Sequence, residues 1–239
     1  MEPMRYVISG ANRGLGLEFV RQLLIRGDTV EAGTRAPAEA RQLASLAREA
    51  GGRLRIHPLD ISNTHSVRSF AAAVCEAPID VLINNAGVAG KWDPLPETDF
   101  EDMARTLEIN TLGSMRMCAT LISAVLKSNT RKIVHMTSRL ASMVENSHVG
   151  YYQHPGGLYP YRMSTAALNA LMRTMAVDYR EQGLITAVLA PGWVQTDMGG
   201  KTAALTPEES VLGMLRVIDG LNMERSGRFF DYSGKECPL

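Results

Sequence analysis

The sequence predicts an α/β fold: one domain, residues 1–239, with a doubly wound parallel sheet of about seven strands and helices on both faces. Two observations predict it. Short apolar runs alternate with helical patterns along the whole chain, and a glycine-rich turn separates the first run from the first helical pattern. Repeated strand–helix units form parallel sheets that are covered on both sides. A length of 239 residues suits one domain of this class.

Seven apolar runs are the expected strands, and the segments between them carry the expected helices. Strands are expected at residues 6–8, 29–33, 54–57, 79–83, 132–136, 184–189 and 227–231. After the helix that follows the glycine turn, further helices are expected at residues 38–50, 64–75, 100–126, 161–181 and 207–220. No internal repeat or long linker divides the chain, which favours one domain.

The turn after the first strand is rich in glycine and reads Ser9-Gly10-Ala11-Asn12-Arg13-Gly14-Leu15-Gly16. A strand, a tight glycine turn and a helix N-terminus form the Rossmann-type arrangement that binds the phosphates of a dinucleotide. Glycine lets the backbone approach the pyrophosphate, and the free N–H groups of the helix point toward its negative charge. We therefore expect cofactor contacts from Gly10, Asn12, Arg13, Gly14, Leu15 and Gly16. A glycine-rich turn that binds nothing is the alternative.

The bulk composition argues against several classes of protein. Lys plus Arg equals Asp plus Glu at 25 each, so no excess of positive charge predicts a nucleic-acid or membrane partner. The three cysteines are widely spaced, which argues against a disulfide framework or a metal site and for a reducing compartment. The N-terminus lacks signal-peptide features, and no run of 18 apolar residues predicts a transmembrane segment. We expect a cytoplasmic protein.

The end of the second strand indicates which dinucleotide binds. A carboxylate about 20 residues after the glycine turn would select NAD through the ribose 2′-hydroxyl. This strand ends instead in Arg35, and Glu31 lies too early, in the middle of the strand. A guanidinium suits a 2′-phosphate, to which Arg13 could contribute. The pattern favours NADP(H), with NAD as the other option and an ordinary surface arginine as the alternative.

Polar turn residues follow the third and fourth strands as well. Asp60 and Ile61 follow the third strand, and Asn84, Ala86 and Gly87 come directly after the core of the fourth. The ends of parallel strands meet at one edge of the sheet, where ligands bind, so these residues are expected to contact the adenine and ribose. Ordinary turn chemistry is the alternative, since Asn, Asp and Gly dominate turns.

Ser138 follows the fifth strand, and Tyr161 opens the next helix. Together with the glycine turn, Asp60, segment 84–87, Asn110 and segment 191–192, these residues resemble the short-chain dehydrogenase/reductase family over essentially the whole chain. Within that family, segments 103–106, 192–200, 214–220 and 226–232 are similar to the myxobacterial C-factor (C-signal) group. That group is related to carbonyl reductases and implicated in developmental cell–cell signalling.

The resemblance implies a role for each matching residue. The tyrosine at position 161 would exchange a proton with a carbonyl or alcohol substrate while hydride passes to or from the nicotinamide. Ser138 would hold the substrate oxygen, and Asn110 would support a proton relay. The nicotinamide end of the cofactor would be lined by Pro191, Gly192, Val194 and Thr196.

One position departs from the family pattern. The family has a lysine four residues after the tyrosine, but this chain has Thr165, and no lysine occurs between Lys132 and Lys201. Lowering a tyrosine pKa from about 10 to about 7 takes roughly 4 kcal/mol, which is about what a cation about 4 Å away supplies at an effective dielectric near 20. Its loss is expected to slow proton transfer near neutrality by up to roughly a thousandfold.

The helix expected at residues 161–181 is apolar on more than one face, which predicts burial on two sides. Family members commonly pair through the helices matching this one and the helix at 100–126, so the resemblance implies a homodimer or homotetramer. Three hypotheses for function remain. The chain is an NADP(H)-dependent oxidoreductase with impaired turnover, a cofactor-binding C-factor-like signalling protein without turnover, or an enzyme whose reaction needs no ionised tyrosine.

Overall fold

The structure is a computed structural model that describes residues 2–147 and 157–239. It contains a seven-stranded sheet in which every neighbouring pair is parallel, in the order β3-β2-β1-β4-β5-β6-β7. The strands are β1 Arg5–Ser9, β2 Thr29–Thr34, β3 Leu54–Pro58, β4 Val81–Asn84, β5 Lys132–Met136, β6 Ile185–Ala190 and β7 Arg228–Asp231. The predicted fold class is confirmed. The strand order reverses between β1 and β4, which is where ligands bind in such sheets.

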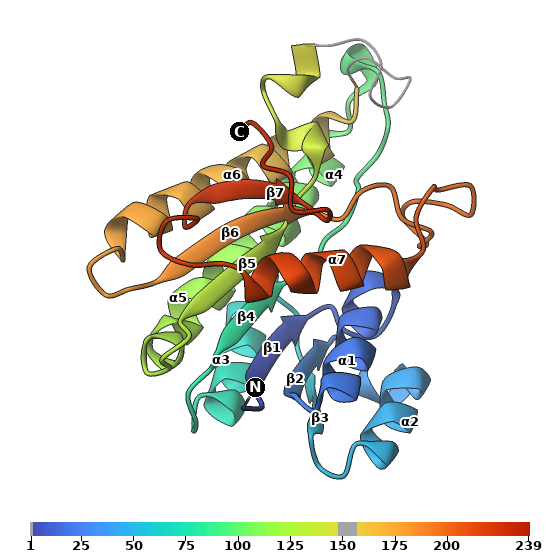
Figure 1. Ribbon diagram of the computed structural model, residues 1–239. Coiled ribbons are helices and arrows are strands. Elements are labelled where there is room, and N and C mark those ends of the chain that lie inside the picture. The colour runs from blue at the N-terminus through green and yellow to red at the C-terminus, as the bar shows by residue number, and fades with distance from the viewer. Residues whose placement is uncertain (1, 148–156) are drawn as a thin grey trace.

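Helices cover both faces of the sheet (Figure 1). They are α1 Gly14–Arg26, α2 Arg41–Glu49, α3 Thr64–Val74, α4 Phe100–Leu107, α5 Ser114–Leu126, α6 Tyr159–Asp178 and α7 Pro207–Asp219. Single turns of 3-10 helix occur at η1 Pro37–Glu39, η2 Leu95–Glu97, η4 Arg139–Ala141 and η5 Glu145–Ser147. The helix expected at 38–50 therefore begins later, at Arg41, after a separate turn at η1.

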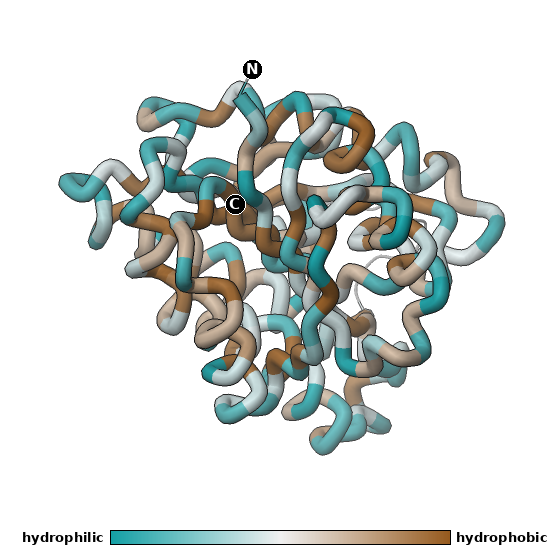
Figure 2. Tube along the Cα trace, turned by 90° about the horizontal axis from the view of Figure 1, so that it is seen from below, coloured by the Kyte–Doolittle hydropathy of each residue, from teal (hydrophilic) through white to brown (hydrophobic). Residues whose placement is uncertain are grey.

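Alternate residues of β1, β4 and β5 supply two separate cores, and a smaller third cluster joins β6 and β7 to α6. Tyr6 and Ile8 of β1 pack with Leu23 of α1 and Met214 of α7 on one face. Val7, between them, packs on the other face among side chains of α3, α5 and α6. Apolar segments accordingly run through the middle of the molecule in Figure 2, with polar turns around them. Burial on both faces explains why the strands read as continuous apolar runs.

The helix expected at 100–126 is continuous but contains a π-helical turn, η3 Glu108–Gly113, between α4 and α5. Its length and composition would allow it to cross a membrane, yet 44% of its most apolar window is buried inside the protein. α5 packs on α3 and the sheet, and α4 packs on α6. Asn110 lies within this π turn, and π turns are often found at functional sites.

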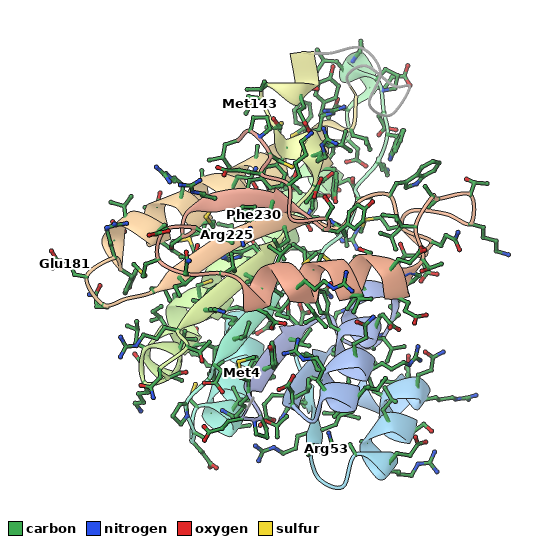
Figure 3. All side chains as sticks on the ribbon, in the orientation of Figure 1. Met4, Arg53, Met143, Glu181, Arg225 and Phe230 are labelled. Atoms are coloured by element: carbon green, nitrogen blue, oxygen red, sulfur yellow. The ribbon has the colours of Figure 1, made fainter. Side chains whose placement is uncertain are left out.

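The two ends of the sheet differ in what they carry. Figure 3 shows Met4 and Arg53 at the end where the strands begin, and Met143, which follows β5, at the opposite end. The glycine turn and the connections after β4, β5 and β6 all leave the sheet at that opposite, carboxyl end. At the last strand, the guanidinium of Arg225 lies 4.3 Å from the ring centroid of Phe230 (Figure 3).

Candidate active site

The glycine turn is held in place by the end of β4. The Ser9 Oγ atom accepts hydrogen bonds from the backbone N–H groups of Asn85 and Ala86, each at 3.1 Å. The Asn85 side-chain amide donates to the carbonyl oxygens of Ser9 and Gly10, both at 3.0 Å. Ser9 and Asn85 were not among the predicted site residues, although both lie within the motifs from which the site was predicted. Their hydrogen bonds fix the turn against the place where the strand order reverses.

Two glycines of the turn have no space for a side chain. Gly10 has φ of +68°, and a Cβ there would lie 2.9 Å from Ala86 Cα. A Cβ on Gly16 would lie 2.2 Å from the Gly10 carbonyl oxygen. Arg13 is the N-cap of α1 and supplies no side-chain cap, so the first N–H groups of α1 remain able to bind an anion. Asn12 and Arg13 are exposed, and Leu15 is half-buried.

Arg35 and the glycine turn lie at the same edge of the sheet. The Ala11 N–H donates to the Gly33 carbonyl oxygen at 3.1 Å, which holds the turn beside the end of β2. Arg35 follows β2, is exposed, and has no side-chain hydrogen bond or ion pair within residues 2–147 and 157–239. Arg13 differs, because its guanidinium pairs with Asp197 from the β6–α7 connection. Arg13 must therefore release Asp197, or share its charge, to bind a phosphate.

Glu31 lies in the middle of β2, where it is buried and cannot bind a ribose hydroxyl. It is 2% exposed, forms ion pairs with Arg5 and Arg55, and hydrogen-bonds His57. Burial by itself would raise the pKa of Glu31, but the hydrogen bonds from His57, Arg5 and Arg55 hold the pKa at about 2. Glu31 is thus a structural anion that joins β1, β2 and β3.

The residues predicted after β3 and β4 divide between turn and core positions. Asp60 Oδ1 accepts hydrogen bonds from the N–H (3.0 Å) and the hydroxyl (2.6 Å) of Ser62. This is ordinary turn chemistry, the alternative to a cofactor contact. Ile61 is 6% exposed and belongs to the core that contains α3 and α5. Ala86 touches the glycine turn. A Cβ on Gly87 would lie 3.2 Å from Asn110 Oδ1.

Asn84 lies in the core rather than at the edge. It is 2% exposed, and its amide nitrogen is 3.4 Å from Cys118 Sγ and 3.3 Å from His135 Nδ1. Burial lowers the pKa of His135 to about 4 and raises the pKa of Cys118 to about 12. Both groups are therefore neutral near pH 7, and the cluster holds neither an imidazolium nor a thiolate. Asn84 is the last residue of β4, so it affects the site only by fixing the position of that strand.

Ser138 and Tyr161 lie together. Their side chains are joined by a hydrogen bond, although 22 residues lie between them in the sequence. Ser138 is the N-cap of η4, where its Oγ atom also accepts from the N–H of Leu140 at 3.2 Å. Burial raises the pKa of Tyr161 above its usual value, and the hydrogen bond to Ser138 lowers it only in part. Tyr161 is therefore a neutral phenol near pH 7.

Thr165 occupies the lysine position and faces its own helix. Its hydroxyl is within hydrogen-bonding distance of the carbonyl oxygens of Tyr161 (2.7 Å) and Arg162 (3.2 Å), and the residue is 3% exposed. Within the described residues, no lysine or arginine lowers the pKa of Tyr161. Residues 148–156, which lie outside the described part, contain no lysine or arginine in the sequence.

Asn110 sits in the π turn with its side chain fully engaged. Its amide group accepts from the Val88 N–H at 2.8 Å and donates to the Val88 carbonyl and to Ser164 Oγ, both at 2.9 Å. The backbone carbonyl oxygen of Asn110 accepts from the Ser114 hydroxyl at 2.9 Å. Asn110 therefore joins the segment after β4 to the first turns of α6, the helix that carries Tyr161.

The β6–α7 connection brings one of its predicted residues, Thr196, to the glycine turn and holds the others against its own end and α7. Gly192 has φ of +80°, and a Cβ there would lie 2.6 Å from Leu205 Cδ1. Thr196 lies beside Gly14, whose added Cβ would be 3.5 Å from the Thr196 methyl group. Val194 is buried and bridges to Leu205. The carbonyl of Pro191 accepts from Ser210 Oγ at 2.7 Å, which ties the connection to α7.

The described residues thus bring a glycine turn at a helix N-terminus and a serine–tyrosine pair to one edge of a parallel sheet. A family model described as short chain dehydrogenase matches residues 5–205. The chain belongs to the short-chain dehydrogenase/reductase family. It is 52% identical to C-signal from Myxococcus xanthus over 172 residues, which cover 72% of this chain and 99% of that protein.

Solved structures agree with this assignment. The NADPH-bound carbonyl reductase from chicken fatty liver superposes with a TM-score of 0.93 at 31% identity, covering 100% of both chains. The carbonyl reductase Sniffer of D. melanogaster superposes with a TM-score of 0.91 at 29% identity, also over 100% of both chains. A family resemblance inferred from scattered motifs is therefore confirmed over the whole chain.

No group of metal-ligating side chains occurs within the described residues.

Proposed function

We propose that this protein is a cytoplasmic, single-domain oxidoreductase that binds NADP(H) and transfers hydride between the cofactor and a carbonyl compound or secondary alcohol. The observation that carries this proposal is the hydrogen bond between Ser138 and Tyr161 at the carboxyl edge of the sheet, the edge that also carries the glycine turn. A phenol and a hydroxyl together can hold one substrate oxygen and exchange a proton with it.

The residues of the site fit the cofactor. The unsatisfied N–H groups at the start of α1 suit the pyrophosphate, and the close contacts of Gly10 and Gly16 leave backbone rather than side chains facing it. Thr196 and Gly192 lie on the connection that reaches the same turn. When bound, the nicotinamide would supply the hydride for carbonyl reduction or take it up in alcohol oxidation. Tyr161 would donate or accept the proton, and Ser138 would orient the substrate oxygen.

NADP(H) is favoured over NAD(H) by charge. Arg35 is an exposed guanidinium at the end of β2, and Glu31, the carboxylate of that strand, is buried and paired. The carbonyl reductase from chicken fatty liver was solved with NADPH bound, which supports the same preference here. A 2′-phosphate near Arg35 gains a charge-assisted hydrogen bond that NAD cannot make.

We further propose that turnover is impaired because Thr165 brings no charge to Tyr161. Its hydroxyl already bonds to the helix backbone, so it does not replace the lysine. A second function is favoured by the same observation together with the 52% identity to C-signal: a protein that binds the cofactor, does not turn it over and acts in signalling between cells. The two candidates share the binding site and differ in turnover.

A homodimer or homotetramer is part of the proposal. Large apolar side chains are exposed on the paired helices α4–α5 and α6, and Met115 (51%) and Val177 (65%) are examples. α4 and α6 pack on each other, so these side chains lie on one helical layer. A second copy that packs there would bury them. Sedimentation velocity at micromolar concentration tests this, and a monomer alone would contradict it.

Calorimetric titration with NADPH and NADH tests the cofactor proposal independently of turnover. We expect NADPH to bind more tightly than NADH, and Arg35→Ala to weaken NADPH at least tenfold while NADH binding stays within twofold, which corresponds to loss of one charge-assisted contact. Arg48→Ala, an exposed arginine of α2, is the matched control. If neither nucleotide binds at millimolar concentration, the proposed function is wrong.

A further inference from the structure

Arg162 directly follows Tyr161 and makes two hydrogen bonds that the proposed chemistry does not use. Its Nε atom donates to the Gly157 carbonyl oxygen at 2.9 Å, and its Nη1 atom donates to the Leu140 carbonyl oxygen at 3.3 Å. The residue is half-buried, and burial lowers the pKa of its guanidinium. Both acceptors are backbone carbonyl groups, which lie in two different segments. Arg162 therefore joins segments rather than neutralising a carboxylate.

The first of these segments contains Ser138. Leu140 belongs to η4, the single turn that Ser138 caps, and the Leu140 N–H donates to Ser138 Oγ. Leu140 thus makes both contacts: its carbonyl oxygen accepts from Arg162, and its N–H donates to the Ser138 hydroxyl. A shift of Leu140 would move Ser138 relative to Tyr161, because both contacts belong to one turn of three residues.

The second segment is the start of α6. Gly157 and Leu158 both have left-handed backbone conformations, with φ of +70° and +54°. For a residue such as Leu158 this conformation is unfavourable and persists only where its surroundings enforce it. The Arg162 side chain holds Gly157, and the Arg162 N–H donates to the Leu158 carbonyl at 2.9 Å. Arg162 therefore also sets how α6 begins, at Tyr159, two residues before Tyr161.

We propose that Arg162 is a positioning residue that keeps Ser138 within hydrogen-bonding distance of Tyr161. This inference rests on the proposed function, since it assigns Arg162 to the same serine–tyrosine pair. Arg162 touches neither substrate nor cofactor in this assignment, and it acts by fixing η4 against the first turn of α6. A displacement of about 1 Å at such a pair lowers turnover by about a hundredfold.

The test combines Arg162→Met and Arg162→Lys with Ser138→Ala in a double-mutant cycle. Lysine keeps the charge but cannot donate to both carbonyls in the same geometry, so it covers the case in which methionine prevents folding. Arg173→Met is the matched control, because Arg173 lies on the same helix and also donates to a backbone carbonyl, that of Gly227, at 3.2 Å. We expect Arg162→Met to lower kcat for carbonyl reduction tenfold to a hundredfold, with the Kd for NADPH unchanged within twofold.

In the Ser138→Ala background, Arg162→Met should lower kcat less than twofold further, since the serine it positions is absent. Independent, multiplicative effects of the two substitutions would overturn the proposal. An equal loss of NADPH affinity and of kcat would do so as well, because it would indicate a general structural role. Arg173→Met should leave kcat within twofold of the native value.

A second readout does not depend on turnover. The ¹³Cζ resonance of Tyr161, assigned with Tyr161→Phe, reports the hydrogen bond to Ser138 at pH 8. We expect Ser138→Ala and Arg162→Met to shift it in the same direction, and the double variant to equal Ser138→Ala. An unmoved resonance in Arg162→Met would overturn the proposal even in a chain without turnover. Absence of NADPH binding would instead contradict the proposed function and leave this readout intact.

Discussion

The Thr165 hydroxyl lies 2.7 Å from the carbonyl oxygen of Tyr161, the residue one helical turn before it. This is the position from which the family's lysine would place a charge near the phenol. Here the hydroxyl is directed to the backbone of its own helix, and Tyr161 has a raised pKa. The site therefore has the hydrogen bond between Ser138 and Tyr161 but lacks the cation that would favour the ionised form of Tyr161.

Replacing Thr165 with lysine should raise turnover. A cation about 4 Å from Tyr161 would contribute about 4 kcal/mol to the ionised form, so we expect NADPH oxidation with a panel of carbonyl compounds to rise by up to about a thousandfold at pH 7. Thr165→Val, of similar size and without charge, is the control and should stay near the native rate. Equal rates in the native chain and in Thr165→Lys would show that turnover here does not depend on this charge.

Alcohol oxidation should depend steeply on pH. Oxidation requires the tyrosinate of Tyr161, and burial raises the pKa of this phenol above its usual value near 10. The ionised fraction at pH 7 is therefore below about one in a thousand, and the rate should rise about tenfold per pH unit between pH 7 and 9. Carbonyl reduction starts from the protonated phenol and should change little over that range.

Initial rates in both directions, measured with saturating cofactor, test this difference. Tyr161→Phe should abolish the pH-dependent part of oxidation. An oxidation rate that is flat between pH 7 and 9 would mean that a group other than Tyr161 accepts the proton.

Glu31 should make the protein sensitive to acid. Its pKa is lowered from 4.5 to about 2 in the folded protein, so its contribution to stability is complete above the unfolded value. That contribution is lost as the pH falls from about 4.5 to about 2, and it amounts to about 3 kcal/mol. Chemical denaturation between pH 2 and 6 should show this loss. Glu31→Gln should be less stable at pH 6 and should flatten the acid limb, and an unchanged limb would contradict the assignment.

Gly16→Ala should damage both the fold and the cofactor site. The added Cβ would lie 2.2 Å from the Gly10 carbonyl oxygen and 2.6 Å from the Asn85 amide nitrogen, and such overpacking typically costs about 1–3 kcal/mol. We expect a lower melting temperature and at least tenfold weaker NADPH binding. Gly220→Ala is the control, because Gly220 has a negative φ and its nearest neighbour is the mobile end of Arg225. Equal behaviour of the two variants would contradict the prediction.

The neighbouring residues Asn84 and Asn85 show where sequence reasoning reaches its limit. Both follow the same apolar run, and the motif alone does not say which faces the glycine turn. Successive residues of a strand point to opposite sides, so Asn84 enters the core beside Cys118 while Asn85 holds the turn. Arg13 illustrates the same limit, because its partner Asp197 is 184 residues away in the sequence.

The sequence by itself determined the parallel α/β architecture, the glycine turn, the basic residue after β2 and the absence of lysine at position 165. These follow from local patterns of polarity and spacing, which act over a few residues. Only the tertiary structure decided that Ser138 meets Tyr161, that Thr165 bonds to its own helix and that Arg162 joins η4 to the start of α6. Such contacts depend on how distant segments pack, and the free energy that selects them comes from the whole core rather than from any one segment.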